Sequence, residues 1–149
     1  MSSNAASVLL LTALLALPAA AKDVELAEPK PSFDNPRKIV LQLSEDEPRA
    51  VNNLLYNAVN LQKFYGQDMV QVAVVAYGPG VRALLKESSP VAERISSLQR
   101  YEVEFVACGN TLETIGKTVD ALLPGVSVVQ TGLAEVTERQ LKGWIAIKP

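Results

Sequence analysis

The stretch YEVEFVACGNTLETIG, residues 101–116, decides how this sequence folds. Residues 103–107 are mostly apolar, which predicts a buried strand, and this strand ends at Cys108, the only cysteine of the chain. A Gly-Asn turn follows, and a helix is expected to begin near Thr111. A thiol at the carboxyl end of a parallel strand, facing the start of a helix, lies where open α/β sheets place their chemistry. The positive end of that helix would favour the thiolate form of Cys108.

Apolar runs and helix-like periods alternate on both sides of this stretch. The apolar runs predict four further strands, at residues 38–43, 69–76, 126–129 and 144–147. The helices between them are expected to include one that starts in the acidic turn at 44–48, one over 111–121 and a short one over 138–142. Strands and helices that alternate with short connections predict an α/β domain with a parallel sheet and helices on both faces.

Composition excludes several classes of function. The 149 residues suffice for one compact domain, and the net charge of -2 comes without a basic stripe, so we expect no nucleic-acid partner. The chain has no histidine, which removes Ser-His-Asp and Cys-His catalysis and the usual zinc and haem ligands. A single cysteine cannot form an intramolecular disulfide, a CxxC pair or a multi-thiolate metal site. We therefore expect no metal and no cofactor.

The amino terminus is typical of an export signal. Residues 8–18 (VLLLTALLALP) form an apolar run that is too short to span a bilayer, and three alanines follow before the charged Lys22. We predict a signal peptide at 1–21 with cleavage near Ala21, hence a periplasmic or secreted protein with no membrane span after cleavage. The region before the run lacks Lys and Arg, so an apolar terminus that is disordered or packed on the surface is the alternative. Residues 22–37 contain three prolines and predict an extended tail.

A second turn of interest follows the strand at 69–76. Gly78 and Gly80 in this YGPG turn would let backbone amides approach an anion or a neighbouring chain. The turn is not a phosphate-binding loop, because no Gly-Lys-Ser/Thr follows it. A simple tight connection between strand and helix explains it equally well.

Several pieces of the chain, in this order and spacing, resemble the DsrE/DsrF-like family of sulfur-relay proteins. They are the strand at 38–43, AYGPGV at 76–81, EFVACGNTL at 104–112, LLPGVSVV at 122–129 followed by Gly132, and RQLKGWIAIKP at 139–149. The resemblance covers residues 38–149 and implies a three-layer α/β/α domain with a five-stranded, mostly parallel sheet. It also implies homo-oligomers (dimers, trimers or hexamers) and a cysteine that carries sulfur as a persulfide and passes it to another protein.

The resemblance also implies the residues of a site. Cys108 matches a recurrent family cysteine, and the positions expected to line its crevice are Asn60, Gly78, Gly80, Gly109, Asn110 and Thr111. The first hypothesis is a periplasmic, sulfurtransferase-like carrier or thiol relay, with an accessible Cys108 and a sulfur donor or acceptor protein as partner. The alternative is a non-catalytic, oligomeric binding or accessory domain in which Cys108 only packs, because unpaired cysteines are often buried as small apolar residues.

Overall fold

The computed structural model describes residues 20–149. Contacts divide the chain into two units, Met1–Lys30 and Pro31–Pro149. In the first unit the described residues, 20–30, contain no helix or strand, and nearly all of the expected signal peptide lies outside the described part. The second unit holds all the elements discussed below.

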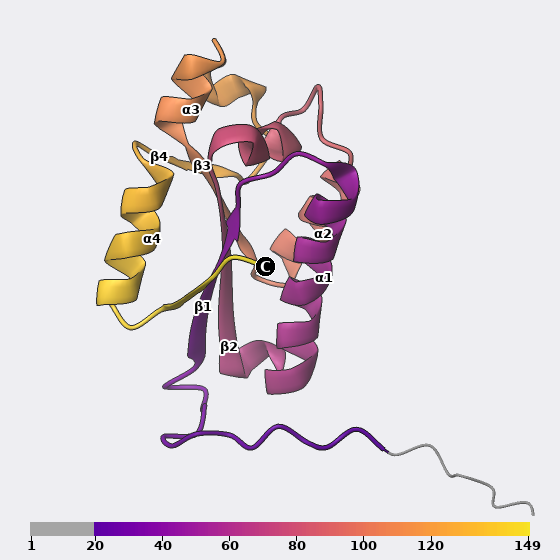
Figure 1. Ribbon diagram of the computed structural model, residues 1–149, viewed down its shortest axis with the longest axis vertical. Coiled ribbons are helices and arrows are strands. Elements are labelled where there is room, and N and C mark those ends of the chain that lie inside the picture. Colours follow the sequence, from indigo (N-terminus) through magenta and orange to yellow (C-terminus); the bar gives the residue numbers. More distant parts are fainter. Residues whose placement is uncertain (1–19) are drawn as a thin grey trace, which may run out of the picture. The chain divides into compact units, whose positions relative to one another are not determined.

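Five parallel strands form the centre of the second unit, in the order β4-β3-β2-β1-β5 (Figure 1). Their bounds are β1 Arg37–Leu43, β2 Val70–Ala76, β3 Glu104–Cys108, β4 Ser127–Val129 and β5 Ile145–Ile147. All pairs are parallel, which confirms the predicted sheet. Cys108 is opposite Val129 of β4 at the carboxyl end of the sheet.

Helices cover both faces of the sheet, as the alternation predicted. The α-helices are α1 Pro48–Tyr65, α2 Ala92–Arg100, α3 Gly109–Thr114 and α4 Gly132–Leu141. The 3-10 segments are η1 Gln67–Met69, η2 Gly78–Leu84 and η3 Val119–Ala121. Figure 1 shows α1 and α2 on one face, α4 on the other, and α3 beyond the carboxyl ends of the strands. The described part of the chain is therefore a three-layer α/β/α domain.

Each face of the sheet has its own core, because successive strand residues point to opposite faces. The larger core lies on the side of α1 and α2 and includes Leu41, Leu55 and Phe105, each at most 1% exposed. The smaller core lies under α4 and contains Val40, Ala73, Val75, Val106 and Val136. Full burial of a valine, leucine or phenylalanine side chain contributes about 1.5–3 kcal/mol. Because Val136 of α4 belongs to the smaller core, this core is complete only when α4 packs against the sheet.

Helix ends follow local chemistry, and two of the predicted helices were wrong in extent. The Glu47 carboxylate accepts from the N–H groups of Arg49 and Ala50, and these two hydrogen bonds lower the pKa of Glu47 and fix the start of α1. The helix predicted over 111–121 is split into α3 and η3, because Gly116 adopts a φ of +68° and ends the helical path. The helix predicted over 138–142 begins earlier, at Gly132.

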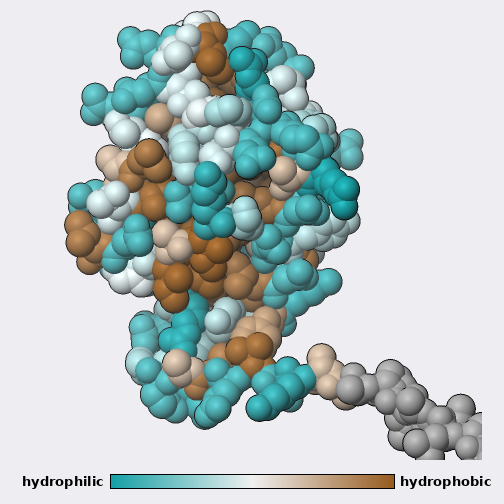
Figure 2. Space-filling model, viewed as in Figure 1, coloured by the Kyte–Doolittle hydropathy of each residue, from teal (hydrophilic) through white to brown (hydrophobic). Residues whose placement is uncertain are grey.

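The edge strand β5 leaves apolar side chains in solvent. Figure 2 shows apolar residues gathered on the viewed face between α4 and α1, where β5 forms the edge of the sheet. On β5, Ile145 and Ile147 are 55% and 38% exposed, and Leu141 at the end of α4 is 77% exposed. A patch of this kind on an unpaired strand edge is typical of a contact surface. Within residues 20–149, no helix is both long and apolar enough to cross a membrane.

Candidate functional site

Cys108 lies where two helices begin. It is the last residue of β3, and α3 starts at the next residue. Since β4 is the parallel neighbour of β3, the chain that leaves β4 brings the first residue of α4, Gly132, against Cys108. Gly132 and Cys108 are in close contact, because a Cβ atom on Gly132 would lie only 3.2 Å from Cys108 Cβ. The positive ends of both helices therefore face the sulfur.

Four groups around the sulfur favour its thiolate. They are the Thr111 hydroxyl and the backbone N–H groups of Gly132, Thr111 and Asn110. The Asn110 N–H also donates to Gln130 O at 3.0 Å, so we count Thr111 and Gly132 as the main donors. Neither α3 nor α4 has a side-chain cap at its start. One group favours the neutral thiol: Gln130 O accepts from Cys108 Sγ over 3.9 Å.

These groups decide the charge of the sulfur. Burial is the largest single effect and by itself raises the pKa of Cys108. The hydrogen bonds from the Thr111 hydroxyl and from the three backbone N–H groups together outweigh burial, so the pKa of Cys108 is lowered. A lowered pKa means that Cys108 forms the thiolate, the nucleophilic form of a cysteine, at a lower pH than an ordinary cysteine does. The sequence predicted that the start of one helix favours the thiolate, and in the structure the starts of two helices, α3 and α4, lie at Cys108.

The Thr111 hydroxyl is oriented by the turn after β2. Gly78 N donates to Thr111 Oγ1 at 3.0 Å. This bond occupies the hydroxyl as an acceptor and leaves its proton available for Cys108 Sγ. Gly78 thus acts on the sulfur through Thr111, although the two residues are far apart in the sequence.

The thiol is more covered than the carrier hypothesis expects. Cys108 is 5% exposed and forms part of the larger core. It lies at the rim of that core, where polar groups face its sulfur, rather than among apolar side chains alone. Its placement at the end of the sheet is as expected. Its small exposed fraction is closer to the packed cysteine of the alternative hypothesis than to the accessible thiol of the first.

The other residues of the expected crevice fall into two groups. Gly78, Gly109, Asn110 and Thr111 lie around Cys108 through the contacts above and through chain adjacency. Gly80 does not line an open crevice, because its Cα packs against the end of β1, and a Cβ there would lie 2.6 Å from the Leu43 carbonyl carbon.

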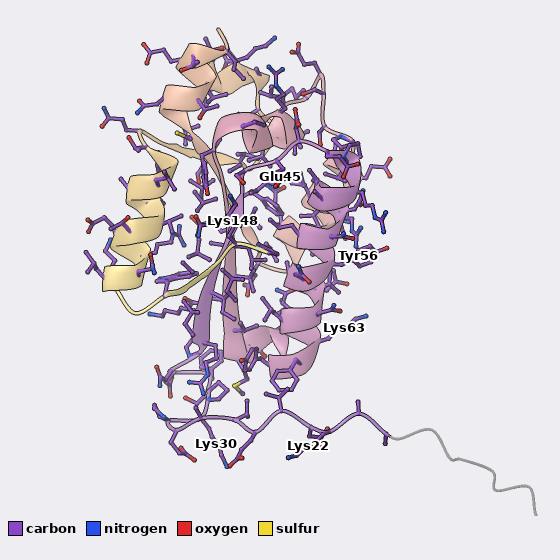
Figure 3. All side chains as sticks on the ribbon, viewed as in Figure 1. Lys22, Lys30, Glu45, Tyr56, Lys63 and Lys148 are labelled. Carbon is purple, nitrogen blue, oxygen red and sulfur yellow. The ribbon has the colours of Figure 1, made fainter. Side chains whose placement is uncertain are left out.

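The structure does not bring Asn60 to Cys108. Asn60 is an exposed residue of α1. It lies between Tyr56 and Lys63, which Figure 3 shows on the side of α1 that faces away from the sheet, and helical spacing puts Asn60 on that same side. It contributes nothing to the surroundings of the sulfur.

Sequence reasoning left Gly132 out of the site. Its N–H reaches the sulfur only because β4 pairs with β3, and strand order is not visible in a single sequence. The available signal was its position directly after the strand at 126–129, at the same end of the sheet as Cys108. Among residues 20–149, no group of three or more Cys, Asp or Glu is placed to hold a metal ion.

We expect the charge of Cys108 to depend on the Thr111 hydroxyl. In Thr111→Val the pKa of Cys108 should rise, because one donor to the thiolate is lost while shape is kept. Thiolate would then form only at higher pH, so the pH profile of thiolate ultraviolet absorbance and of alkylation rate should shift to higher pH. Thr111→Ser keeps the hydroxyl and should retain the wild-type profile. Identical profiles for the valine and serine variants would contradict this role.

Comparisons with known proteins agree with this architecture. The family model described as DsrE/DsrF-like family matches residues 38–149. The structure of a protein of unknown function, MTH1491 from Methanobacterium thermoautotrophicum, is 36% identical, covers 76% of this chain and 99% of its own, and superimposes with a TM-score of 0.72. The ychN protein from E. coli is 15% identical, covers 76% of this chain and 97% of its own, and shares the fold with a TM-score of 0.62. No curated protein matches the chain. The chain belongs to the DsrE/DsrF-like family.

Proposed function

We propose that this protein is a sulfur carrier in which Cys108 holds sulfur as a persulfide and passes it to another protein. Members of the DsrE/DsrF-like family are generally sulfur-relay proteins. The observation that carries the proposal is the convergence of the starts of α3 and α4 on Cys108, with a lowered pKa as its result. A persulfide is itself an anion, so the same N–H groups would stabilise the loaded form.

The chemistry needs only a thiolate and a donor with a sulfane sulfur. The Cys108 thiolate attacks the outer sulfur of the donor, a new S–S bond forms at Sγ, and the S–S bond of the donor breaks. The electron pair of the broken bond leaves with the donor, so no separate oxidant is required. Delivery reverses these steps with an acceptor thiolate. Neither step needs a histidine base, since Cys108 is already biased toward the charged form.

A second function is favoured by one observation. Cys108 is 5% exposed and belongs to the larger core, as a cysteine with a purely structural role would be. In that case the protein is a non-catalytic binding or accessory domain. The two functions differ in whether folded Cys108 accepts sulfur, and that difference can be measured directly.

Intact-mass measurement after incubation with thiosulfate or polysulfide tests the proposal. We expect the folded protein to gain the mass of one sulfur atom, and a thiol reductant should remove it. The Cys108→Ala variant should gain nothing, because it contains no other cysteine. The increment should survive desalting, since it is covalent.

The denatured wild-type protein is the matched control. If the folded protein neither gains sulfur nor reacts with an alkylating reagent, while the denatured protein is alkylated in full, Cys108 is a packing residue. That outcome would reject the carrier and favour the accessory domain.

Export and self-assembly complete the proposal. We infer export from the apolar run at 8–18 and the alanines at 19–21, and amino-terminal sequencing of the secreted protein would locate the cleavage. Proteins of this family are often oligomeric, and the exposed patch on β5 offers a surface for a second copy. Light scattering would give the number of subunits, and a monomer at all concentrations would reject assembly.

A further inference from the structure

A cavity of about 360 Å³ adjoins the Cys108 site. Gly78, Arg82, Asn110 and Thr111 are among the residues that line it. Thr111 and Asn110 belong to both places, because they line the cavity and their groups also act on the sulfur. A small molecule in this cavity therefore lies next to the groups that hold Cys108 in its charged form.

The charge of the cavity comes from one side chain. Among the described residues that line it, Arg82 is the one that is ionised at neutral pH. Arg82 is about half exposed, and its Nε lies 3.8 Å from Asp46 Oδ2. An exposed pair at this distance holds the guanidinium weakly, which leaves most of its donors available.

An arginine in this setting suits an oxyanion. The planar guanidinium presents a fork of N–H groups that matches a carboxylate or a sulfonate. The cavity also contains the apolar side of Ile115, which would contact a short carbon chain. A thiolate repels anions. A positive group in the cavity that adjoins the Cys108 site would therefore help a negatively charged reactant to bind there.

We infer that this cavity binds the anionic end of the sulfur donor and that Arg82 is the residue that recognises it. The inference rests on the proposed function of Cys108. The donor class is a small oxyanion that carries a sulfane sulfur, such as thiosulfate or the persulfide of a carboxylate-bearing thiol. Arg82 holds the oxyanion, and the sulfane sulfur is then presented to Cys108 Sγ.

The transfer balances without a further reactant. With thiosulfate, the Cys108 thiolate bonds to the outer sulfur, the S–S bond of thiosulfate breaks, and its electron pair leaves with sulfite. One thiolate and one dianion give one persulfide anion and one dianion, so atoms and charge are conserved. With a persulfide donor, the leaving group is the carboxylate-bearing thiolate instead. In both cases Arg82 stays paired with the oxyanion of the leaving group.

Iodoacetate and iodoacetamide separate anion recognition from sulfur chemistry. They alkylate the same thiolate and differ chiefly in one negative charge. We expect Arg82→Gln to slow iodoacetate about tenfold, as the loss of a charge-assisted hydrogen bond would, and iodoacetamide by no more than about twofold. Asp46→Asn should speed iodoacetate, because it removes the competing carboxylate. Arg100→Gln, which makes the same charge change on the exposed end of α2, should alter neither rate.

Sulfur transfer completes the test, with thiosulfate and the persulfide of mercaptoacetate as donors. Arg82→Gln should slow the transfer of sulfur to Cys108 about tenfold for whichever of these two donors resembles the natural one. Slowing with thiosulfate alone identifies a sulfonate-like donor, and slowing with the persulfide alone identifies a carboxylate.

The outcomes separate the two claims. An unchanged iodoacetate-to-iodoacetamide ratio in Arg82→Gln overturns the anion site, even if Cys108 takes up sulfur. A changed ratio with no sulfur uptake from any donor supports the anion site and rejects the carrier. If neither reagent reaches folded Cys108, both claims fail.

Discussion

Replacement of Gly80 by alanine is expected to lower the free energy of unfolding by about 3 kcal/mol or more. A Cβ at this position would overlap the Leu43 carbonyl oxygen and lie 2.6 Å from the Leu43 carbonyl carbon. Both atoms belong to the backbone at the end of β1, so no side-chain rotation relieves the overlap. The same carbonyl accepts from Tyr77 N at 3.1 Å, and this bond would be disturbed as well.

Other glycines of the domain provide a graded series for this measurement. A Cβ on Gly109 would lie 3.0 Å from Val129 O, and one on Gly132 would lie 3.2 Å from two side-chain Cβ atoms, so both variants should lose less stability than Gly80→Ala. Gly143 has no atom within 4 Å of such a Cβ, but its φ is +86°. Gly143→Ala should therefore cost only the backbone penalty of about 1–2 kcal/mol.

Urea unfolding followed by the fluorescence of the single tryptophan, Trp144, would give these values. A Gly80→Ala protein as stable as Gly143→Ala would show that η2 can move away from β1. In that case the placement of Gly78, and with it the orientation of the Thr111 hydroxyl, would not depend on this contact.

Loss of the Arg139 charge should be the second large effect, with a cost of about 2–3 kcal/mol in Arg139→Met. Arg139 of α4 is 11% exposed in its side chain and donates to Glu104 of β3 at 2.8 Å and to Glu135 at 2.7 Å. Its guanidinium also lies over the Trp144 ring, 4.6 Å from the centroid. One side chain thus links α4 to β3 and to the residue before β5.

The pKa of Arg139 shows the same balance. Burial is the largest effect and acts to lower it, but the hydrogen bonds to Glu104 and Glu135 prevail and raise it. The charged form is therefore stabilised in the fold. Methionine keeps the apolar stem against Trp144 and removes the charge, so the measured loss reports the ion pairs.

Arg100→Met is the matched control for this change. Arg100 is likewise near the end of its helix, but it is exposed and reaches only Ser96 Oγ, at 3.4 Å. Its replacement should stay within about 0.5 kcal/mol of wild type. A double-mutant cycle with Glu104→Gln would assign the share of the β3 contact. Equal losses in the two arginine variants would contradict a special role for Arg139.

The sequence was most informative where apolar runs were short and continuous. All five strands appear within one residue of their expected bounds, because buried parallel strands need such runs. Helix extents were less predictable. The end of α3 depends on the positive φ of Gly116, and α4 begins with Gly132, a residue that is unfavourable inside helices but tolerated at their start.

Only those residues of the site that are close to one another in the sequence could be predicted. Cys108, Asn110 and Thr111 are neighbours in sequence, so a strand, a turn and a helix sufficed to place them. Gly132 required the pairing of β4 with β3, which single-sequence patterns do not reveal. Whereas Gly132 was missed, Asn60 was included wrongly: it was assigned to the site from the resemblance alone, and it lies on the outer side of α1.

The depth of Cys108 has a consequence for its chemical lifetime. A thiolate that is open to solvent is readily converted by peroxide to sulfinic and sulfonic acids, which a carrier cannot reverse. With 5% of its surface exposed, the sulfur of Cys108 offers such oxidants little to attack. The chain contains no second thiol to rescue an oxidised one. If the protein is exported as proposed, this cover would protect Cys108 against irreversible oxidation in an oxidising compartment.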